Sequence, residues 1–177
     1  RDKKGQLNYQ FLKDYFTSSK KTKKKRPKIT VANLNLSNTQ FKYDDYRKKN
    51  TTSAVDYFHL DIKEINGKTT HLKLDKGIYS ANIESLSFKE KSGFTLEDLT
   101  ANAAVSYNGI FLKNLLLSSE ASRIEAEKFN MLSTGLEDFK HFVDSIQFDA
   151  RIERSIVDLS EAALFAPVLD GMNDTIQ

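Results

Sequence analysis

Histidine, the side chain best suited to proton transfer near neutral pH, occurs three times in this sequence, as His59, His71 and His141. No two of them have the close spacing that places a pair of metal ligands on one helix. His59 and His71 precede Leu60 and Leu72 in segments of alternating polarity, at the positions that should face water. We therefore predict solvated strand histidines and no metal site.

The acidic residues are equally poor candidates for acid–base chemistry. Two adjacent pairs, Asp44-Asp45 and Glu97-Asp98, stand out, but neighbours on a strand point to opposite faces and make a poor catalytic pair. We predict that they are solvated surface charges. The sequence has no nucleophile-elbow, dinucleotide or phosphate-loop motif, and no cysteine for disulfides, thiolate-bound zinc or a thiol nucleophile. We expect neither an enzyme nor a bound cofactor.

The chain has 177 residues, a length for one domain or two small ones, and 39% of them are hydrophobic. Its longest uncharged apolar stretch, residues 162–169, is far shorter than the roughly 20 residues that cross a bilayer. There is no signal peptide, and the first residue is Arg1 rather than methionine. We therefore expect a piece of a longer protein.

The net charge of +3 comes from one short basic segment, residues 20–28. It holds seven basic residues and no acidic one, and the rest of the chain has 20 basic against 24 acidic residues. A nucleic-acid-binding module would spread its basic residues over the folded surface, so we expect no nucleic-acid partner. Like-charge repulsion and Pro27 favour an exposed loop over residues 18–27. The seven basic residues are Lys20, Lys21, Lys23, Lys24, Lys25, Arg26 and Lys28.

The elements that would position these residues change in character near residue 28. Residues 1–17 are predicted to form a short amphipathic helix, because apolar residues recur there at helical spacing. Beyond residue 28, apolar and polar residues alternate, the pattern of strands with one apolar face. The alternation slips by one residue in places, for example between Leu96 and Leu99. A β-bulge or turn at each slip would keep the apolar side chains on one side.

Three glycines at equal spacing, Gly77, Gly93 and Gly109, indicate a sixteen-residue repeat. An apolar residue follows each glycine directly. We interpret each repeat as two short strands and two turns, added up and down to a growing antiparallel sheet. Such repeats bury their apolar face only against their neighbours.

Two further short helices are expected nearer the C-terminus, at 135–144 and 159–166. Thr134 opens the first with a capping-box pattern. Either Asp158 or Ser160 is placed to cap the second. The helical segments remain few for a sheet that takes up most of residues 28–177, including a strand at 146–152. At 119–128 the residue types favour a helix, but Ile124 and Ala126 continue the alternation and we favour a strand. An ordinary covered core, a closed barrel, a sandwich and an uncovered apolar groove are all compatible with this imbalance.

Several segments together resemble one protein family. They are LNYQFLKDYF (7–16), ITVANLNLSNTQFKYDD (29–45), YFHLDIKEING (57–67), YSANIESLSFKEKSGFTLEDL (79–99) and LSEAALFAPVLDGMN (159–173). In this order they resemble the TamB/AsmA-like proteins of the Bacteroidota cell envelope, over nearly the whole chain. The segments 79–99 and 159–173 carry the more specific phrases.

The resemblance implies a fold and a location. TamB-like proteins are anchored in the inner membrane by an N-terminal helix, span the periplasm, and work with an outer-membrane barrel partner, TamA. Their body is a long sheet curled into an open groove lined by apolar side chains, which is similar to bridge-like lipid transfer proteins. The fold class expected here is therefore mainly β: an elongated, repetitive antiparallel sheet curled into an open groove, with one N-terminal and two C-terminal short helices. The chain would be a segment near the N-terminal part, after the anchor.

The first functional hypothesis is an apolar β-groove that carries phospholipid between the inner and outer membranes, without catalysis. The alternative is a scaffold for translocation and assembly of outer-membrane barrels or autotransporters, in which an open sheet edge pairs with a client strand. The residues expected to line the lipid groove are Ile83, Leu86, Phe88, Phe94, Leu96, Leu99, Ile110, Leu112, Leu115 and Leu117.

The basic segment has two interpretations. It is either a solvated linker or, if the missing anchor precedes it, a segment that attracts anionic lipid head groups. Each basic residue near such a surface contributes on the order of 1 kcal/mol, and the attraction fades within about 10 Å. The membrane interpretation requires that the loop lies close to the bilayer.

Overall fold

The structure is a computed structural model in which the chain forms one long sheet followed by a small C-terminal unit. It describes residues 3, 28–51, 54–135, 145–166, 169, 171 and 175–176. The N-terminal helix expected within 1–17, the loop at 18–27 and the helix expected at 135–144 lie outside the described residues, apart from Lys3 and Gly135.

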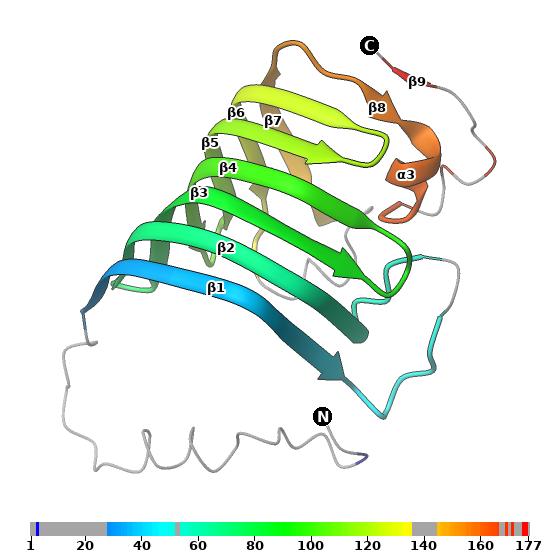
Figure 1. Cartoon of the computed structure of the whole chain (residues 1–177), viewed down its shortest axis with the longest axis horizontal. Helices are drawn as coiled ribbons and strands as arrows, with labels where there is room; N and C mark the ends of the chain where they lie inside the picture. Colours follow the sequence, from blue (N-terminus) through cyan, green and yellow to red (C-terminus); the bar gives the residue numbers. More distant parts are fainter. Residues whose placement is uncertain are drawn as a thin grey trace.

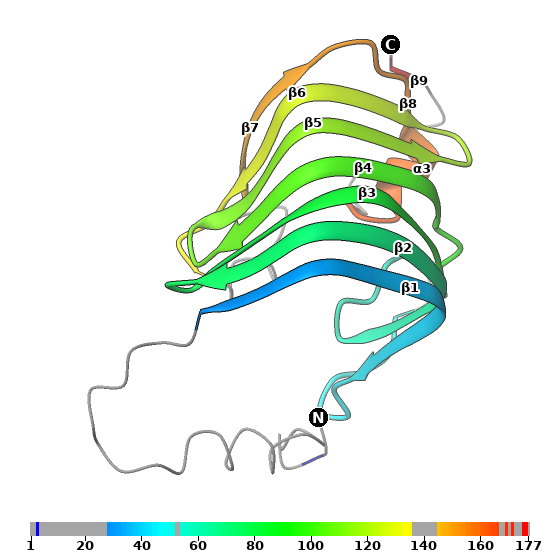
Figure 2. The same cartoon turned by 60° about the vertical axis from the view of Figure 1, so that its left-hand side comes forward.

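Seven strands pair in the order β1-β2-β3-β4-β5-β6-β7, and every pairing is antiparallel. Each strand therefore lies beside its neighbour in sequence, and the sheet is open rather than closed into a barrel. Figures 1 and 2 show that the strands arch together, so that the sheet has a convex side and a hollow side. The strands are β1 (Ile29–Asp44), β2 (His59–Asp75), β3 (Ile78–Glu90), β4 (Thr95–Ser106), β5 (Gly109–Ser119), β6 (Arg123–Leu132) and β7 (Gln147–Ile152).

Several of the slips in alternation coincide with register shifts, which is the β-bulge that the sequence analysis gave as one of two possibilities. The pairing of β4 with β5 shifts between Leu96 and Asp98, just before Leu99. Glu64 and Asn114, with φ values of 53° and 51°, lie at similar shifts in β2 and β5. A bulge reverses the alternation and bends the strand, so the apolar side chains stay on one face and that face becomes curved.

The glycine repeat corresponds to one strand and one turn, not to two strands and two turns as the spacing suggested. Gly77 lies in the turn between β2 and β3, Gly93 lies between β3 and β4, and Gly109 begins β5. All three have positive φ. Strands of 11 to 13 residues fill the repeat because a bulge lets a strand continue across a slip in its alternation.

After β7 the chain forms β8 (Val157–Asp158), helix α3 (Leu159–Ala163) and β9 (Thr175–Ile176), with β8 and β9 paired. Asp158, one of the two caps considered, caps α3 by accepting a hydrogen bond from the backbone N–H of Glu161 at 3.0 Å; the helix covers only the first part of the 159–166 range predicted for it. Strands predicted at 119–128 and 146–152 correspond to β6 and β7. No helix within the described residues has the length and apolarity needed to span a bilayer.

Candidate functional site: the hollow face of the sheet

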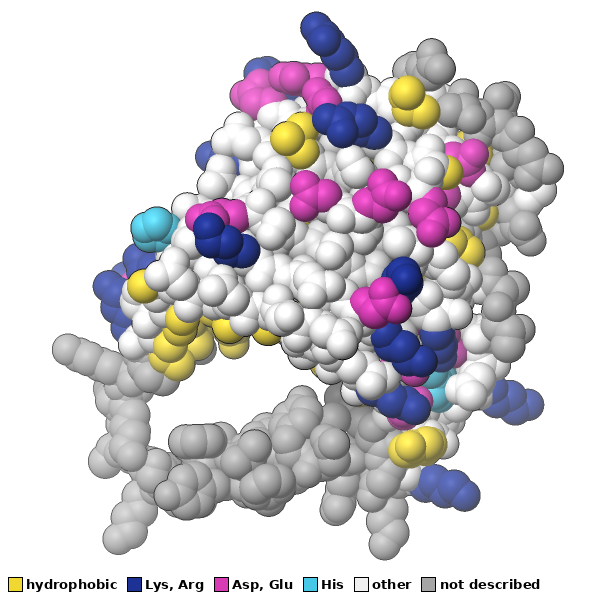
Figure 3. Space-filling view, viewed as in Figure 1, with side chains coloured by type: hydrophobic (Ala, Val, Ile, Leu, Met, Phe, Trp, Pro, Cys, Tyr) yellow, Lys and Arg dark blue, Asp and Glu magenta, His cyan; other side chains and the backbone are white. Residues whose placement is uncertain are grey.

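The hollow side of the sheet carries a continuous apolar surface, which we call the groove face. Its continuity follows from the strand register, because residues paired across antiparallel strands project to the same side. Figure 3 shows apolar side chains gathered along the underside of the sheet, while charged and other polar groups cover the outer surface. One row of paired residues crosses all seven strands and is apolar throughout: Ile29, Leu74, Tyr79, Val105, Ile110, Met131 and Phe148.

The groove face is open along this row and at both edges. Ile29 and Phe41 on β1 are 49% and 50% exposed, and Phe148 and Ile152 on β7 are 53% and 54% exposed. Tyr79, in the middle of the row, is 54% exposed. Contiguous exposed apolar surface of this kind usually marks a binding site.

The middle of the groove face is better packed. Ala101, Leu115 and Ala126 form a buried cluster on β4, β5 and β6, and Phe129 is among the half-buried side chains packed against it. Even so, no described side chain is less than 2% exposed. The core is therefore a single layer of side chains on one sheet, without a second sheet of described residues opposite it.

One end of the groove face is closed by the segment around α3. The ring of Phe165 meets the ring of Phe94 edge-on, with centroids 4.7 Å apart, and Phe94 lies 6.1 Å from Phe88. Glu161 of α3 accepts a hydrogen bond of 2.6 Å from the hydroxyl of buried Ser119, at the end of β5. The row that begins with Ile29 runs along the opposite end, beside the turn that contains Gly77 and the turn that precedes Gly109, and is not covered by α3.

The ten residues predicted to line a groove are largely on this face. Nine lie on β3, β4 and β5 with their side chains on the groove face, and seven of these nine are half-buried. Leu96 and Leu115 are only 3% exposed; Leu115 belongs to the buried cluster in the middle of the face, and Leu96 lies beside Phe88 and Ser119 nearer the closed end. Phe94 departs from the prediction, because it lies in the β3–β4 connection and packs against Phe165 at the closed end.

The ten residues singled out from the sequence come from 83–117 and leave out the outer strands of the groove face. β1, β2, β6 and β7 contribute members of the groove face such as Phe41, Leu72, Phe129 and Phe148. These strands were predicted by the same alternation as β3 to β5, but their residues were not among the ten expected to line the groove.

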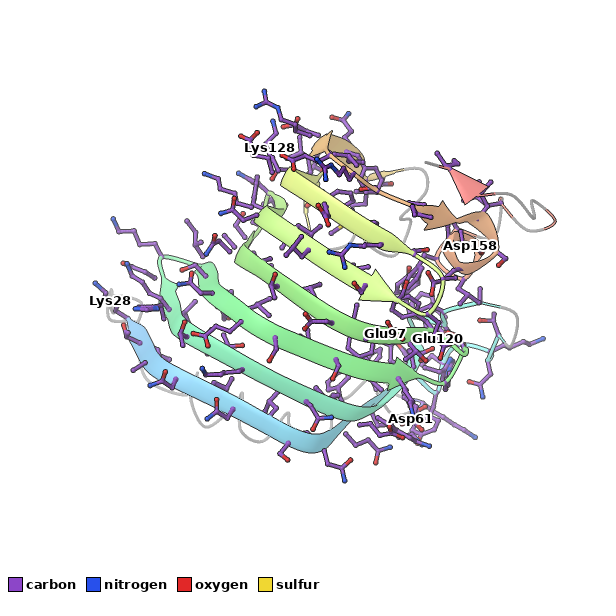
Figure 4. The ribbon with its side chains drawn as sticks, turned by 45° about the horizontal axis from the view of Figure 1, so that its top comes forward. Lys28, Asp61, Glu97, Glu120, Lys128 and Asp158 are labelled. Atoms are coloured by element: carbon purple, nitrogen blue, oxygen red, sulfur yellow. The ribbon has the colours of Figure 1, made fainter. Side chains whose placement is uncertain are left out.

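The convex face is polar and is cross-linked by side-chain hydrogen bonds. The Asn102 amide donates to Asn82 Oδ1 and the Asn114 amide donates to Asn102 Oδ1, both at 3.0 Å, and the Asn82 amide lies 3.4 Å from His71 Nδ1. His71 is exposed, as predicted. In Figure 4, which looks onto this face, polar side chains project from every strand, with Lys28 and Lys128 at opposite edges.

The end of the sheet near α3 buries polar groups that the sequence analysis placed in solvent. His59 is 4% exposed and its Nδ1 lies 3.0 Å from Oδ2 of Asp56, which is also buried. Asp45 is 2% exposed and accepts two hydrogen bonds from the Arg47 guanidinium, at 2.6 and 2.8 Å. The predictions of a solvated His59 and a solvated Asp45 were wrong, because the 45–58 loop folds against the strand ends and the backbone of Leu164.

The pKa values of these two carboxyls are shifted downwards. The side-chain hydrogen bond from Arg47 lowers the pKa of Asp45 well below its ordinary value of 3.8. Burial raises the pKa of Asp56, but hydrogen bonds from the backbone N–H groups of Thr51 and Phe58 and from His59 outweigh it, so the net direction is also downwards. Both groups are therefore ionised in the folded state at neutral pH.

These pKa shifts predict acid sensitivity. Because the folded pKa values lie below the unfolded ones, the unfolded state binds more protons, and the stabilisation present above about pH 4 is lost as the pH falls towards the folded values. We expect the midpoint of urea unfolding to be nearly constant from pH 7 to about pH 5 and to drop below about pH 4. Asp45→Asn should lower the midpoint at pH 7 and reduce this drop. The exposed Asp98, changed to Asn, is the control; an equal effect of both variants would contradict the assignment.

The remaining predicted site residues are those of the basic segment and the Glu97-Asp98 pair. Of the basic segment, the structure describes only Lys28, whose Nζ lies 3.9 Å from Asp75 Oδ2. Glu97 and Asp98 are exposed, as predicted. The described residues contain no group of three or more His, Asp or Glu side chains arranged to hold a metal ion.

Comparison with known proteins adds no relative: no family model, no curated protein and no solved structure matches the chain. The groove face and its register are therefore the basis for a functional assignment.

Proposed function

We propose that this chain is a lipid-conducting segment of a TamB/AsmA-like cell-envelope protein. Its groove face would solvate the acyl chains of phospholipids as they move between the inner and outer membranes. The observation that carries the proposal is the apolar row that crosses all seven strands and is exposed at both edges of an open sheet. The polar convex face would remain in the aqueous periplasm.

The physical role of the groove is passive. Burying one methylene group from water contributes about 0.8 kcal/mol, so a few carbons of an acyl chain suffice to hold a lipid on the apolar surface. The interior of a bilayer is equally apolar, and transfer from the bilayer to the groove is close to neutral in free energy. A surface with these properties takes up and releases lipid without a chemical reaction, so we propose no catalytic function and no cofactor.

The proposal places the full-length protein in the periplasm, tethered to the inner membrane through an anchor outside this chain, with a TamA-like barrel contacted by other parts. The alternative, a scaffold for barrel or autotransporter assembly, draws support from the open edges of the sheet, where a client strand would pair. The two functions differ in where the ligand lies. Lipid would contact the groove face, and a client polypeptide would contact β1 or β7.

Photocrosslinking tests whether lipid contacts the groove face, as the lipid function requires. We expect p-benzoylphenylalanine at Leu112, on the groove face, to crosslink to labelled lipid when the protein is mixed with vesicles of phosphatidylethanolamine and phosphatidylglycerol. The matched control is the next residue, Lys113, which is exposed on the convex side of the same strand. Equal lipid labelling at both positions, or none at Leu112, would refute the lipid-groove proposal.

A further inference from the structure

The outer edge of β1 is the longest unpaired backbone in the described part of the sheet. β1 has 16 residues, and among the described residues only β2 pairs with it. The N–H and C=O groups directed away from β2 therefore have no described strand partner. Such an edge is a template for pairing with another strand.

The two edges of the sheet differ in how they are protected. Proteins usually blunt an edge by shortening it or by placing charges on it. β7 has only six residues, and its Asp149 and Arg151 form ion pairs of 2.8 Å with Lys128 and Glu127. β1 has no proline and only two charged residues, Lys42 and Asp44, both near its C-terminal end. The β1 edge thus lacks the protection that β7 has.

The pattern of side chains along β1 is symmetric about Asn35. The groove-face residues of β1 are Ile29, Val31, Leu34, Leu36, Thr39 and Phe41, followed by Tyr43. If the strand is turned end for end about Asn35, Leu34 exchanges position with Leu36, Val31 with Thr39 and Ile29 with Phe41. From Ile29 to Phe41, each groove-face residue therefore falls on another groove-face residue, and the alternation slips at 32–33 and 37–38 also exchange places.

We propose that two copies of this chain pair through β1, antiparallel and around a two-fold axis at Asn35. Asn35 then lies opposite Asn35 of the second copy, and Asn33 lies opposite its Ser37. The two sheets become one continuous sheet with both groove faces on the same side. This inference does not depend on the lipid function.

Opposed slips are compatible with regular pairing in this fold. β5 and β6 both slip between their groove-face residues, near Asn114 and Glu127, and their register stays unshifted there. β1 and β2 do the same near Ala32 and His71. A second β1 with its slips opposite those of the first repeats this arrangement.

The symmetric arrangement also accounts for the exposed apolar side chains of β1. Ile29 and Phe41 are 49% and 50% exposed, and Leu34 is 38% exposed. In the proposed pair they become cross-strand neighbours of apolar groups from the second copy, the contact that stabilises a sheet. Because a two-fold interface uses the same edge on both copies, assembly stops at the dimer rather than continuing as a filament.

One feature opposes the pairing and makes it dependent on salt. Lys28 and Lys42 of different copies come opposite one another at the ends of the ladder. Each has a carboxylate of its own chain within 4.0 Å, Asp75 at 3.9 Å and Asp44 at 3.8 Å. We expect moderate salt to strengthen the dimer by screening the lysines.

Cysteine crosslinking tests the register, since the natural chain has no cysteine. Asn33→Cys, Asn35→Cys and Ser37→Cys replace exposed polar residues on the convex side of β1. Under mild oxidation, Asn35→Cys alone should form a disulfide-linked dimer. Asn33→Cys and Ser37→Cys should each form no disulfide alone but crosslink to each other when mixed. An unchanged thermal unfolding midpoint of each reduced variant confirms that the fold is intact.

Light scattering provides a second measurement on the unmodified chain. We expect a concentration-dependent dimer whose dissociation constant rises several-fold in Asn35→Asp, because two like charges would face each other. A wild-type chain that stays monomeric at millimolar concentration would overturn the proposal. So would equal crosslinking at all three cysteine positions, or an edge occupied by a different polypeptide while Asn35→Cys remains uncrosslinked.

Discussion

Replacing Leu115 with Asn should lower the thermal unfolding midpoint by about 10 °C or more, whereas the same change at the adjacent Leu116 should lower it by only a few degrees. Leu115 is 3% exposed in the packed centre of the groove face, and Leu116 is 44% exposed on the convex face. Both residues are leucines, and they are adjacent on β5. They differ in the side of the sheet to which they project.

The size of the effect follows from what Asn would replace. Truncating a buried leucine costs about 2–5 kcal/mol, and a buried amide without hydrogen-bond partners adds about 1–3 kcal/mol. At position 116, the amide would face water beside the asparagines of the convex face. The measurement is thermal unfolding of both variants by circular dichroism. Equal shifts would mean that the groove face is not where the fold gains its stability.

Much of the sheet could be predicted because the alternation that identifies a strand lies within the strand's own sequence. Alternation identifies a strand with one apolar face, and a slip in alternation marks a local irregularity such as the bulge found between Leu96 and Asp98. The one-sidedness of the pattern also indicated that the apolar face would be shared by all strands. The strand count per glycine repeat was wrong, because the length of a strand depends on whether a slip is a bulge or a turn, and the alternation is the same for both.

The buried polar end of the sheet was beyond sequence reasoning for a different reason. His59 occupies a position that alternation assigns to water and Asp45 was assigned to water as a charged residue, but their burial depends on contacts between distant segments. Val55, in the loop between them, donates a backbone hydrogen bond of 2.8 Å to the carbonyl of Leu164, more than a hundred residues away. Periodicity describes neighbours within a strand and carries no information on such contacts.

The groove exists because the described chain has too little helix to cover the apolar face of its sheet. A sheet with one apolar face normally buries it against a second layer. Here α3, a helix of five residues, meets only the end of the face near Phe94. The sheet keeps its curvature through bulges and its polar side through the ladder of Asn82, Asn102 and Asn114, so the apolar side is structured without a described second layer.

The second large effect is expected at Gly109, where β5 begins. A Cβ atom there would lie 2.1 Å from the carbonyl oxygen of Met131 on β6, and φ is 136°, a conformation that alanine adopts only with strain. Gly109→Ala should therefore separate the paired ends of β5 and β6 and destabilise the fold by about 3 kcal/mol or more. Gly93→Ala is the matched control, since φ is 103° but no atom lies within 4 Å of the added Cβ.

The control separates backbone strain from the close contact. Gly93→Ala carries strain alone and should cost about 1–2 kcal/mol, less than Gly109→Ala. Urea unfolding of both variants measures the difference, and hydrogen exchange should show the extra loss of protection in the amides that pair β5 with β6, around Ile110 and Met131. If the two variants lost equal stability, the tight approach of Gly109 to Met131 would not exist in solution. The apolar row through Ile110, Met131 and Phe148 would then lack the register on which its continuity rests.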